Sequence, residues 1–186
     1  MNDSEIVRMY LERDESAIKL TKKKYGSLLL MITNNLLESL PDAEECVADT
    51  YIQLWNSIPP NEPESLASYA AKIARNLSLN RLKYIGADKR KASNCALLLE
   101  ELREVIPSNV NVEKEVDGKL LTNLIDRFLE ALPKHHRIIF IRHYWLFEPV
   151  EKIASELGLT KTNVTTSLFR TRQKLKKYLT MEGYNI

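Results

Sequence analysis

Carboxylates are missing from the last long segment of this chain, and cations are missing from an earlier one. Between Leu157 and Met181 there is no Asp or Glu, against six Lys and Arg residues. From Tyr25 to Ala71 there is no Lys or Arg, against seven carboxylates, whereas residues 72–91 carry seven basic residues and one acidic residue. The net charge of +2 therefore conceals charges sorted by segment. This sorting predicts two contacts with nucleic acid and one acidic contact with a basic protein partner. The alternative left open is that each run is only a solvated helix face.

Glycine and cysteine are also scarce. With 5 Gly, 7 Pro and no sustained alternating pattern, the 186 residues predict an all-α fold. Cys46 and Cys95 are isolated, which argues against a disulfide framework and a zinc site, and the pattern indicates neither cofactor nor metal. The longest apolar run, Leu28 to Ile32, is too short for a membrane span, and the polar N-terminus lacks a signal layout. We therefore expect a cytoplasmic protein without membrane insertion.

Apolar spacing and prolines divide the chain into two helical domains joined by a linker. The first half predicts helices over about 14–40, 42–55 and 64–86, with Asp42 as an N-cap and a proline-rich loop at 56–65. The second half predicts helices over 120–132 and 137–146, followed by two more. The predicted domains are 1–92 and 119–186. Residues 93–118 are predicted to form an acidic linker, within which Leu97–Leu99 could instead form a short docked helix.

The C-terminal segment has the spacing of a helix-turn-helix. Pro149 suits a first helical turn, Gly158 suits a left-handed helix end, and Thr160 suits an N-cap. The helix that follows buries one apolar face and leaves the opposite side rich in donors and cations. The apolar residues are Val164, Leu168, Leu175 and Leu179. We predict a recognition helix whose first exposed side chains reach base edges in the major groove, while later Arg and Lys residues contact phosphates.

Two parts of the chain resemble one family. The segments DAEECVADTYIQLWNSI and LASYAAKIARNLSLNRLK resemble the second conserved region of bacterial RNA polymerase sigma factors. The segments LEALPKHHRIIFIRHYWL and VEKIASELGLTKTNVTTSLFRTRQKLKKYL resemble their fourth region. With only these two regions and a short linker, the chain is similar to the extracytoplasmic-function (ECF) group. The chain departs from the family pattern at several positions, among them Asn80, where Asp is usual, and Ser167, where Arg is common.

The resemblance implies three sets of binding residues. The set for core RNA polymerase, at the clamp of its largest subunit, is Asp42, Glu45, Asp49, Thr50, Gln53 and Trp55. The set for the minus-ten promoter element is Asn61, Ser65, Tyr69, Lys72, Arg75, Asn76, Asn80, Arg81 and Lys83. The set for the minus-thirty-five element is Lys161, Thr162, Asn163, Thr165, Thr166, Phe169 and Arg170. The resemblance also implies a contact of the C-terminal domain with the polymerase flap and sequestration by an anti-sigma factor.

Two other classes of function compete with a sigma factor. An enzyme is disfavoured because His135, His136 and His143 have no companion carboxylate at a useful spacing, and no nucleophile or phosphate loop occurs. These histidines are interpreted as neighbours of solvent or phosphate. A stand-alone helix-turn-helix transcriptional regulator would explain the C-terminal half alone. It would leave the acidic helix without a purpose. For Phe169, contact with a thymine methyl and packing against a neighbouring helix both remain open.

Overall fold

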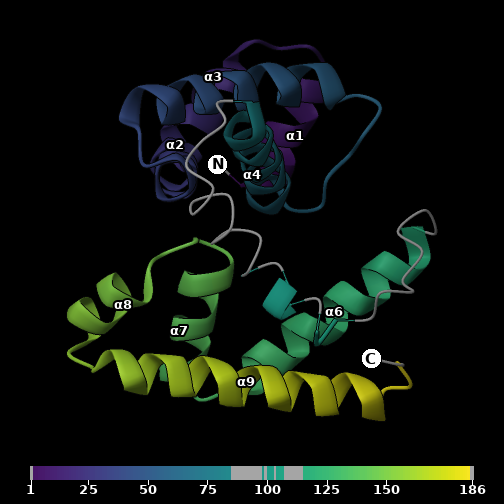
Figure 1. The fold of residues 1–186 in the computed structure, drawn as a ribbon. Coiled ribbons are helices and arrows are strands. Elements are labelled where there is room, and N and C mark those ends of the chain that lie inside the picture. Colours follow the sequence, from purple (N-terminus) through teal and green to yellow (C-terminus); the bar gives the residue numbers. More distant parts are fainter. Residues whose placement is uncertain (1, 85–97, 99, 103, 107–114, 185–186) are drawn as a thin grey trace. The chain divides into compact units, whose positions relative to one another are not determined.

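The computed structural model describes residues 2–84, 98, 100–102, 104–106 and 115–184, and every regular element in those residues is a helix (Figure 1). The predicted all-α class is confirmed. The chain divides into two compact units, Met1–Ser93 and Asn94–Ile186. Each unit has its own hydrophobic core, so we describe each by itself.

The described residues of the N-terminal unit, 2–84, form four helices. They are α1 (Asp3–Leu11), α2 (Ser16–Leu37), α3 (Leu40–Ser57) and α4 (Leu66–Tyr84). Helices α2, α3 and α4 pack against one another in pairs, and α1 contacts α2 and α4. Their shared core includes Tyr10, Leu29, Leu54 and Leu66. The sequence had not predicted α1, a helix whose Asn2 side chain accepts a hydrogen bond from the Glu5 N–H in a capping box.

Helix α1 fixes the start of α4 through one carboxylate. Asp3 Oδ2 accepts hydrogen bonds from the backbone N–H groups of Leu66 (3.1 Å) and Ala67 (3.4 Å). Burial opposes the charge, but hydrogen bonds from Lys24 and Tyr25 and from the Ala67 N–H outweigh it and lower the pKa of Asp3. A carboxylate at the positive end of a helix is favourable. Asp3 of α1 therefore fixes the position of the first turn of α4, the helix predicted to contact minus-ten DNA.

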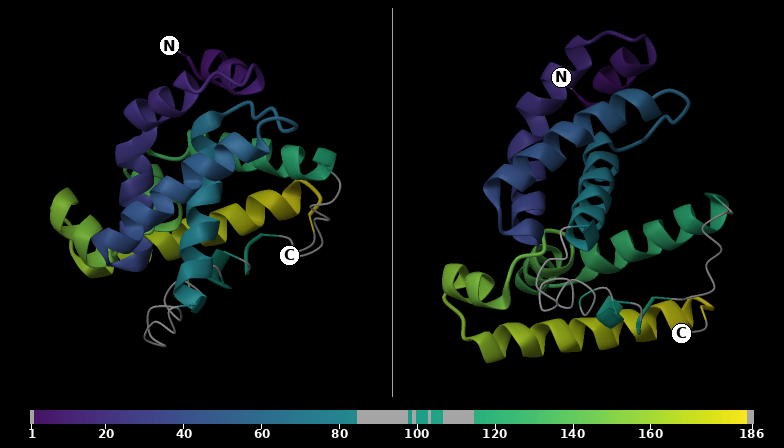
Figure 2. Two further views of the ribbon diagram at one scale, coloured as in Figure 1. Left: turned by 90° about the horizontal axis from the view of Figure 1, so that it is seen from above. Right: turned by 45° about the horizontal axis from the view of Figure 1, so that its top comes forward.

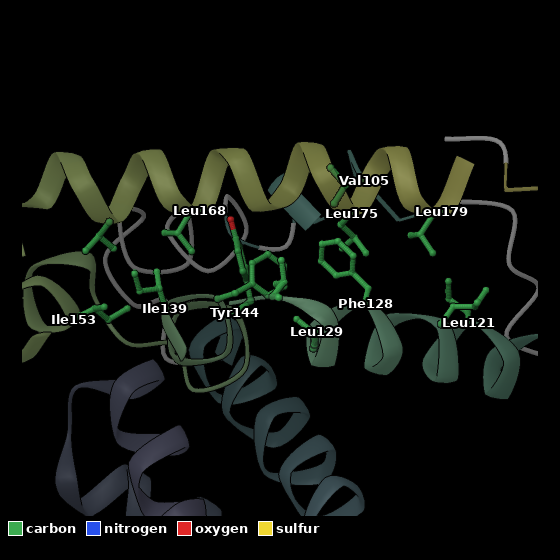
Figure 3. Close-up of a cluster of buried hydrophobic side chains, with 14 of the residues drawn as sticks. Val105, Leu121, Phe128, Leu129, Ile139, Tyr144, Ile153, Leu168, Leu175 and Leu179 are labelled. Atoms are coloured by element: carbon green, nitrogen blue, oxygen red, sulfur yellow. The ribbon is translucent and has the colours of Figure 1, made fainter. Parts of the chain in front are cut away.

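The C-terminal unit is built around its last helix. The helices are α6 (Glu115–Ala131), α7 (Lys134–Tyr144), α8 (Val150–Leu157) and α9 (Lys161–Met181). Helix α9 contacts the other three, with α8 near its start and α6 alongside its second half (Figure 2). Leu175 and Leu179 point from α9 towards Phe128 and Leu121 of α6, whereas Leu168 lies beside Ile139 and Tyr144 of α7 (Figure 3). All four apolar residues predicted for the buried face of α9 are buried.

Part of the predicted linker belongs to this core. Val105 is only 2% exposed, and it lies beside Leu175 (Figure 3). Leu98, Leu102 and Ile106 pack against the same cluster. We call residues 98–106 the docked segment, of which 99 and 103 lie outside the described residues. The predicted short helix at Leu97–Leu99 also lies largely outside them.

Several predicted boundaries need correction. Helix α3 begins at Leu40, so Asp42 lies inside its first turn and is not the N-cap. Helix α7 begins at Lys134, one turn before the predicted start, and ends at Tyr144. The predicted caps of the helix-turn-helix are confirmed at Gly158, which ends α8 with a φ of 65°, and at Thr160. Cys46 is buried, and Cys95 lies outside the described residues. None of the helices in the described residues is long and apolar enough to cross a membrane.

Candidate nucleic-acid and polymerase interface

The turn between α7 and α8 is held by a nearly buried ion pair. Arg142 Nε donates to Glu148 Oε2 at 2.8 Å, and Arg142 Nη2 donates to both Glu148 and Glu156. Glu148 is 4% exposed, and its backbone carbonyl lies 3.0 Å from His143 Nδ1. Burial lowers the pKa of His143. His143 is therefore a packed residue and is neither a solvent neighbour nor a phosphate neighbour. This network joins α7 to α8 and to the turn between them, and removing one partner would leave an uncompensated, nearly buried charge.

Thr160 and Gly158 set the direction of the next helix. The Thr160 side chain accepts a hydrogen bond from the Asn163 N–H at 3.1 Å, which satisfies a free donor of the first turn of α9. The left-handed conformation of Gly158 ends α8. A long helix thus leaves a tight turn with one side of its N-terminal half exposed and the other side packed on α7 and α8, which is the geometry of a recognition helix.

The predicted minus-thirty-five residues lie together on the solvent side of α9. All are exposed except Thr166, which is half-buried. Phe169 is 55% exposed and belongs to neither hydrophobic cluster. Within the described residues Phe169 therefore takes no part in a hydrophobic core, which argues against packing on a neighbouring helix, one of the two roles left open for it. We call this set the reading face: Lys161, Thr162, Asn163, Thr165, Thr166, Phe169 and Arg170.

The cations of the C-terminal unit differ in whether a carboxylate neutralises them. Lys161 lies 3.0 Å from Glu151, an exposed pair that ties α9 to α8. Arg172 is 14% exposed at its side chain and donates to Glu101 Oε2 of the docked segment at 2.6 Å. In contrast, no ion pair is found for Arg170 in the described part of the chain. Arg170 is thus available to an external anion, whereas Arg172 is already paired.

The docked segment makes two further polar contacts. Tyr144 Oη donates to Glu101 Oε2 at 2.6 Å, and Arg172 donates to the same phenol oxygen. Lys176 Nζ donates to the Glu104 carbonyl at 3.3 Å. Burial, followed by the hydrogen bond to Glu101, raises the pKa of Tyr144. A segment that the sequence assigned to a linker therefore neutralises Arg172, in the second half of the recognition helix.

Helix α4 presents most of the predicted minus-ten residues along one line. Their spacing of three and four places them on one side of the helix, and the core residues Leu66, Ala70 and Ile73 lie on the other. All are exposed except Tyr69, which is half-buried against the core of the N-terminal unit. We call this line the α4 stripe: Ser65, Tyr69, Lys72, Asn76, Asn80 and Lys83.

Three predicted minus-ten residues are not on this stripe. Asn61 is exposed in the loop before α4, where its Nδ2 donates to the Ser57 carbonyl at 2.9 Å. Arg75 is half-buried on the flank of α4, and burial lowers its pKa. Arg81 turns towards α3 and pairs with Asp42 and Glu45. The structure therefore does not bring Arg81 together with the α4 stripe. The end of the basic segment, at 85–91, lies outside the described residues.

The predicted polymerase residues form a similar line on α3, with two exceptions. Glu45, Asp49 and Gln53 are exposed at successive spacings of four. Thr50 is 0% exposed, and its hydroxyl donates to the Cys46 carbonyl at 2.7 Å, so its side chain does not reach the surface. Trp55 is half-buried beside Tyr10.

Sequence reasoning missed an apolar residue on this surface. Ile52 is 59% exposed and shares the side of α3 that carries Glu45 and Asp49. Helical spacing placed Ile52 on the same side as Glu45 and Asp49. However, an apolar side chain is ordinarily expected in the core, so its residue type alone did not indicate that it is exposed. We call this surface the α3 stripe, with Asp42, Glu45, Asp49, Ile52 and Gln53 as its members.

The described residues hold no group of three or more His, Cys, Asp or Glu side chains that could bind a metal ion. His135 and His136 stack with their ring centroids 3.8 Å apart at the start of α7. His136 Nδ1 lies 2.6 Å from Ser167 Oγ on α9. The histidines thus face a cationic helix and have no carboxylate partner among the described residues.

These features define a class: a helical protein with a helix-turn-helix unit and a second helical unit that carries separate acidic and cationic surfaces. Family comparisons agree with this class. Residues 22–86 match the family model "Sigma-70 region 2", and residues 122–175 match "Sigma-70, region 4". The chain therefore belongs to the sigma-70 family, as the resemblance predicted.

A curated relative extends the match along the chain. The chain is 25% identical over 138 residues to "ECF RNA polymerase sigma factor SigE" of Mycolicibacterium smegmatis. The match covers 74% of this chain and 52% of that relative, so the chain spans about half the length of the curated relative. The predicted resemblance to ECF-type members of the family is confirmed by these comparisons.

Proposed function

We propose that this chain is a sigma factor that binds core RNA polymerase and directs it to promoters. The observation that carries the proposal is that one chain combines an acidic α3 stripe with two separate DNA-type surfaces. A stand-alone regulator would not explain the acidic α3 stripe. The family matches support the proposal, because region 2 and region 4 follow one another along this chain.

In this proposal the α3 stripe binds a basic surface on the polymerase clamp. The exposed carboxylates Glu45 and Asp49 steer the approach, and Ile52 supplies apolar area next to Asp49. Charge complementarity of this kind sets the register of two surfaces more than it sets their affinity. Thr50 then serves the fold of α3 and does not contact the polymerase.

The α4 stripe is proposed to hold the non-template strand of the minus-ten element. Lys72 and Lys83 would follow its phosphates, while the amides of Asn76 and Asn80 would contact bases. Tyr69 is the aromatic member of the stripe and is half-buried against the core of the unit, so its exposed part is the stacking surface that the stripe offers to a base. Capturing an unstacked base costs a few kcal/mol, which stacking and cationic contacts offset.

The reading face of α9 is proposed to enter the major groove of the minus-thirty-five element. Its threonines and Asn163 would contact base edges, and Arg170 would form the strongest single contact, worth about 1–3 kcal/mol if bidentate. The same unit is proposed to contact the polymerase flap. We further propose that the protein acts in the cytoplasm, where an anti-sigma factor covers its polymerase-binding surfaces.

Run-off transcription tests the proposal. Genomic fragments are transcribed with core enzyme alone, with the chain alone and with both, and the start sites are mapped. We expect a defined set of starts only when both are present. Identical starts with core enzyme alone would contradict the proposal. If the chain by itself selected a palindromic duplex as a dimer, it would be a stand-alone regulator.

A further inference from the structure

A concavity beside the reading face has no carboxylate in its lining, which combines the apolar Ile139 and Leu159 with polar side chains and the cation Arg170. It encloses about 280 Å³ between the start of α7 and the first half of α9. This volume lies below the roughly 300–1,000 Å³ of a small-molecule site, so it fits a single group of a larger ligand. Its polar lining residues are His135, His136, Asn163, Thr166, Ser167 and Arg170.

The surrounding charges select an anion. Arg170 has no ion pair within the described residues, and the other cations that act on His136 are His135 and Lys174. Elsewhere in this unit, Arg142, Lys161 and Arg172 are each neutralised by a carboxylate. The cations around the concavity are thus among those of this unit that have no carboxylate partner in the described residues, and such cations are available to a polyanion.

We propose that this concavity binds one backbone phosphate of duplex DNA and that His136 takes up a proton there when the duplex binds. The inference rests on the proposed function, because it needs the reading face to lie in the groove. Three residues of that face, Asn163, Thr166 and Arg170, also line the concavity. A phosphate next to the bases they contact is therefore within reach of the histidines.

DNA binding depends on pH through the protonation of His136. Ser167 Oγ, 2.6 Å from His136 Nδ1, holds the ring against α9. Burial first, and then the positive charges of His135, Lys174 and Arg170, lower the pKa of His136 below its ordinary value. His136 is accordingly neutral near pH 7 in the free protein. A phosphate anion beside His136 favours the protonated imidazole and so raises its pKa. The complex therefore binds more protons than the free protein does, and the affinity for DNA falls as pH rises.

The test measures histidine pKa values by NMR in the full chain. The chain is titrated alone, with a mixed-sequence duplex at low salt, and with inorganic phosphate. We expect the duplex to raise the pKa of His136 by about one unit, the size of shift that a neighbouring opposite charge produces. A rise with inorganic phosphate alone also supports the site and shows that it takes the free ion. If the duplex binds and the pKa of His136 does not change, the inference is overturned and the proposed function stands.

Affinity measurements complete the test. Fluorescence anisotropy with the same duplex, from pH 5.5 to pH 8, should show wild-type affinity falling about three- to tenfold across the range. His136→Gln and His135→Gln should flatten this dependence. His135 is exposed, so its replacement keeps the test valid if His136→Gln disturbs folding. An unchanged pH dependence in a folded double variant would overturn the inference. Failure of every variant and of the wild type to bind any duplex would instead count against the proposed function.

Discussion

Arg81 Nη2 lies 2.9 Å from Asp42 Oδ1, and this pair joins α4 to α3. The same guanidinium donates to Glu45 at 2.6 Å. Hydrogen bonds from Ser39 and then from Arg81 lower the pKa of Asp42. The sequence assigned these residues to opposite partners, Arg81 to DNA and the two carboxylates to polymerase. The sorting of charges by segment is therefore incomplete in three dimensions: one cation of the basic segment lies among the acids of α3.

Asp49 should contribute more to polymerase binding than Asp42. Asp49 is exposed and has no ion pair within the described residues, whereas Asp42 is already paired. Replacing Asp49 by Lys places like charges together in the complex, and we expect core polymerase affinity to fall at least about tenfold, or about 1.4 kcal/mol. Asp42→Asn should have a smaller effect. Binding to immobilised core enzyme measures both.

Glu44→Lys is the matched control for this prediction. Glu44 is exposed on α3 but lines a different surface, beside Lys22 of α2. The two reversals change the net charge equally, so a general electrostatic effect would weaken both variants alike. Equal affinities for Asp49→Lys and the wild type would remove the α3 stripe from the interface.

Substitutions of Arg81 and Lys72 should have different effects, because Arg81 pairs with carboxylates of α3 whereas Lys72 is proposed to contact DNA. Lys72 is exposed on the α4 stripe, and we expect Lys72→Gln to reduce the salt dependence of single-strand binding by about 0.7 in the log–log slope. Arg81→Gln should leave this slope unchanged and lower the stability of the N-terminal unit only slightly, as is usual for exposed ion pairs. Polymerase-bound chain and a minus-ten single strand at several salt concentrations provide the measurement. A loss of slope in Arg81→Gln would return Arg81 to the DNA-binding set.

Local patterns predicted the elements of the site better than they predicted its contacts. The buried face of α9 followed from apolar spacing, and Gly158 and Thr160 could be assigned because caps depend on neighbouring residues alone. Other contacts join distant positions. Asp3 caps a helix that begins at Leu66, and Glu101 pairs with Arg172. No helical period relates such residues, so tertiary packing alone could reveal them.

Burial of polar side chains was the second source of error. Thr50 was placed in the polymerase-binding set by the family resemblance, which implies an exposed side chain. Its hydroxyl is satisfied within its own helix by the Cys46 carbonyl, so its burial leaves no unpaired donor. Arg75 and Trp55 are similarly drawn inward by their long apolar portions. Helical spacing identified the α4 stripe well because most of its members point directly away from the core.

The Tyr144 hydroxyl should make the C-terminal unit sensitive to alkali. Its pKa is raised above the ordinary value of about 10 in the folded state, so its stabilising effect is complete below pH 10 and is lost as pH rises towards the folded pKa. We expect wild-type stability to decline more steeply above pH 10 than that of Tyr144→Phe, by up to about 1.4 kcal/mol per pH unit. At pH 7 the variant should lose about 1 kcal/mol for one hydrogen bond, while the pair between Glu101 and Arg172 is retained.

Urea unfolding followed by Trp145 fluorescence in a Trp55→Phe background checks this prediction, because Trp145 belongs to the C-terminal unit. Tyr178→Phe is the control, since this half-buried residue has the same chemistry and packs against Phe128 without contacting Glu101. Parallel decline of Tyr144→Phe and the wild type above pH 10 would contradict the role given to the Tyr144 hydroxyl.

The Tyr51 hydroxyl is buried and has no hydrogen-bond partner among the described residues. Because an unsatisfied buried hydroxyl carries a desolvation penalty, we expect Tyr51→Phe to stabilise the N-terminal unit by about 1 kcal/mol. The same hydroxyl restricts α2. A Cβ added at Gly26 would lie 3.3 Å from Tyr51 Oη, a close contact.

The two sites should therefore be coupled. Ala is favoured over Gly in a helix interior by about 0.8–1 kcal/mol, but in the wild type the contact with Tyr51 Oη offsets this gain, so Gly26→Ala alone should change stability little. In a Tyr51→Phe background the contact is absent, and the full gain should appear. A double-mutant cycle measured by urea unfolding, with Trp55 fluorescence in a Trp145→Phe background, gives the coupling. Strict additivity of the two changes would show that the hydroxyl does not restrict Gly26, and destabilisation by Tyr51→Phe would show that it has a partner in solution.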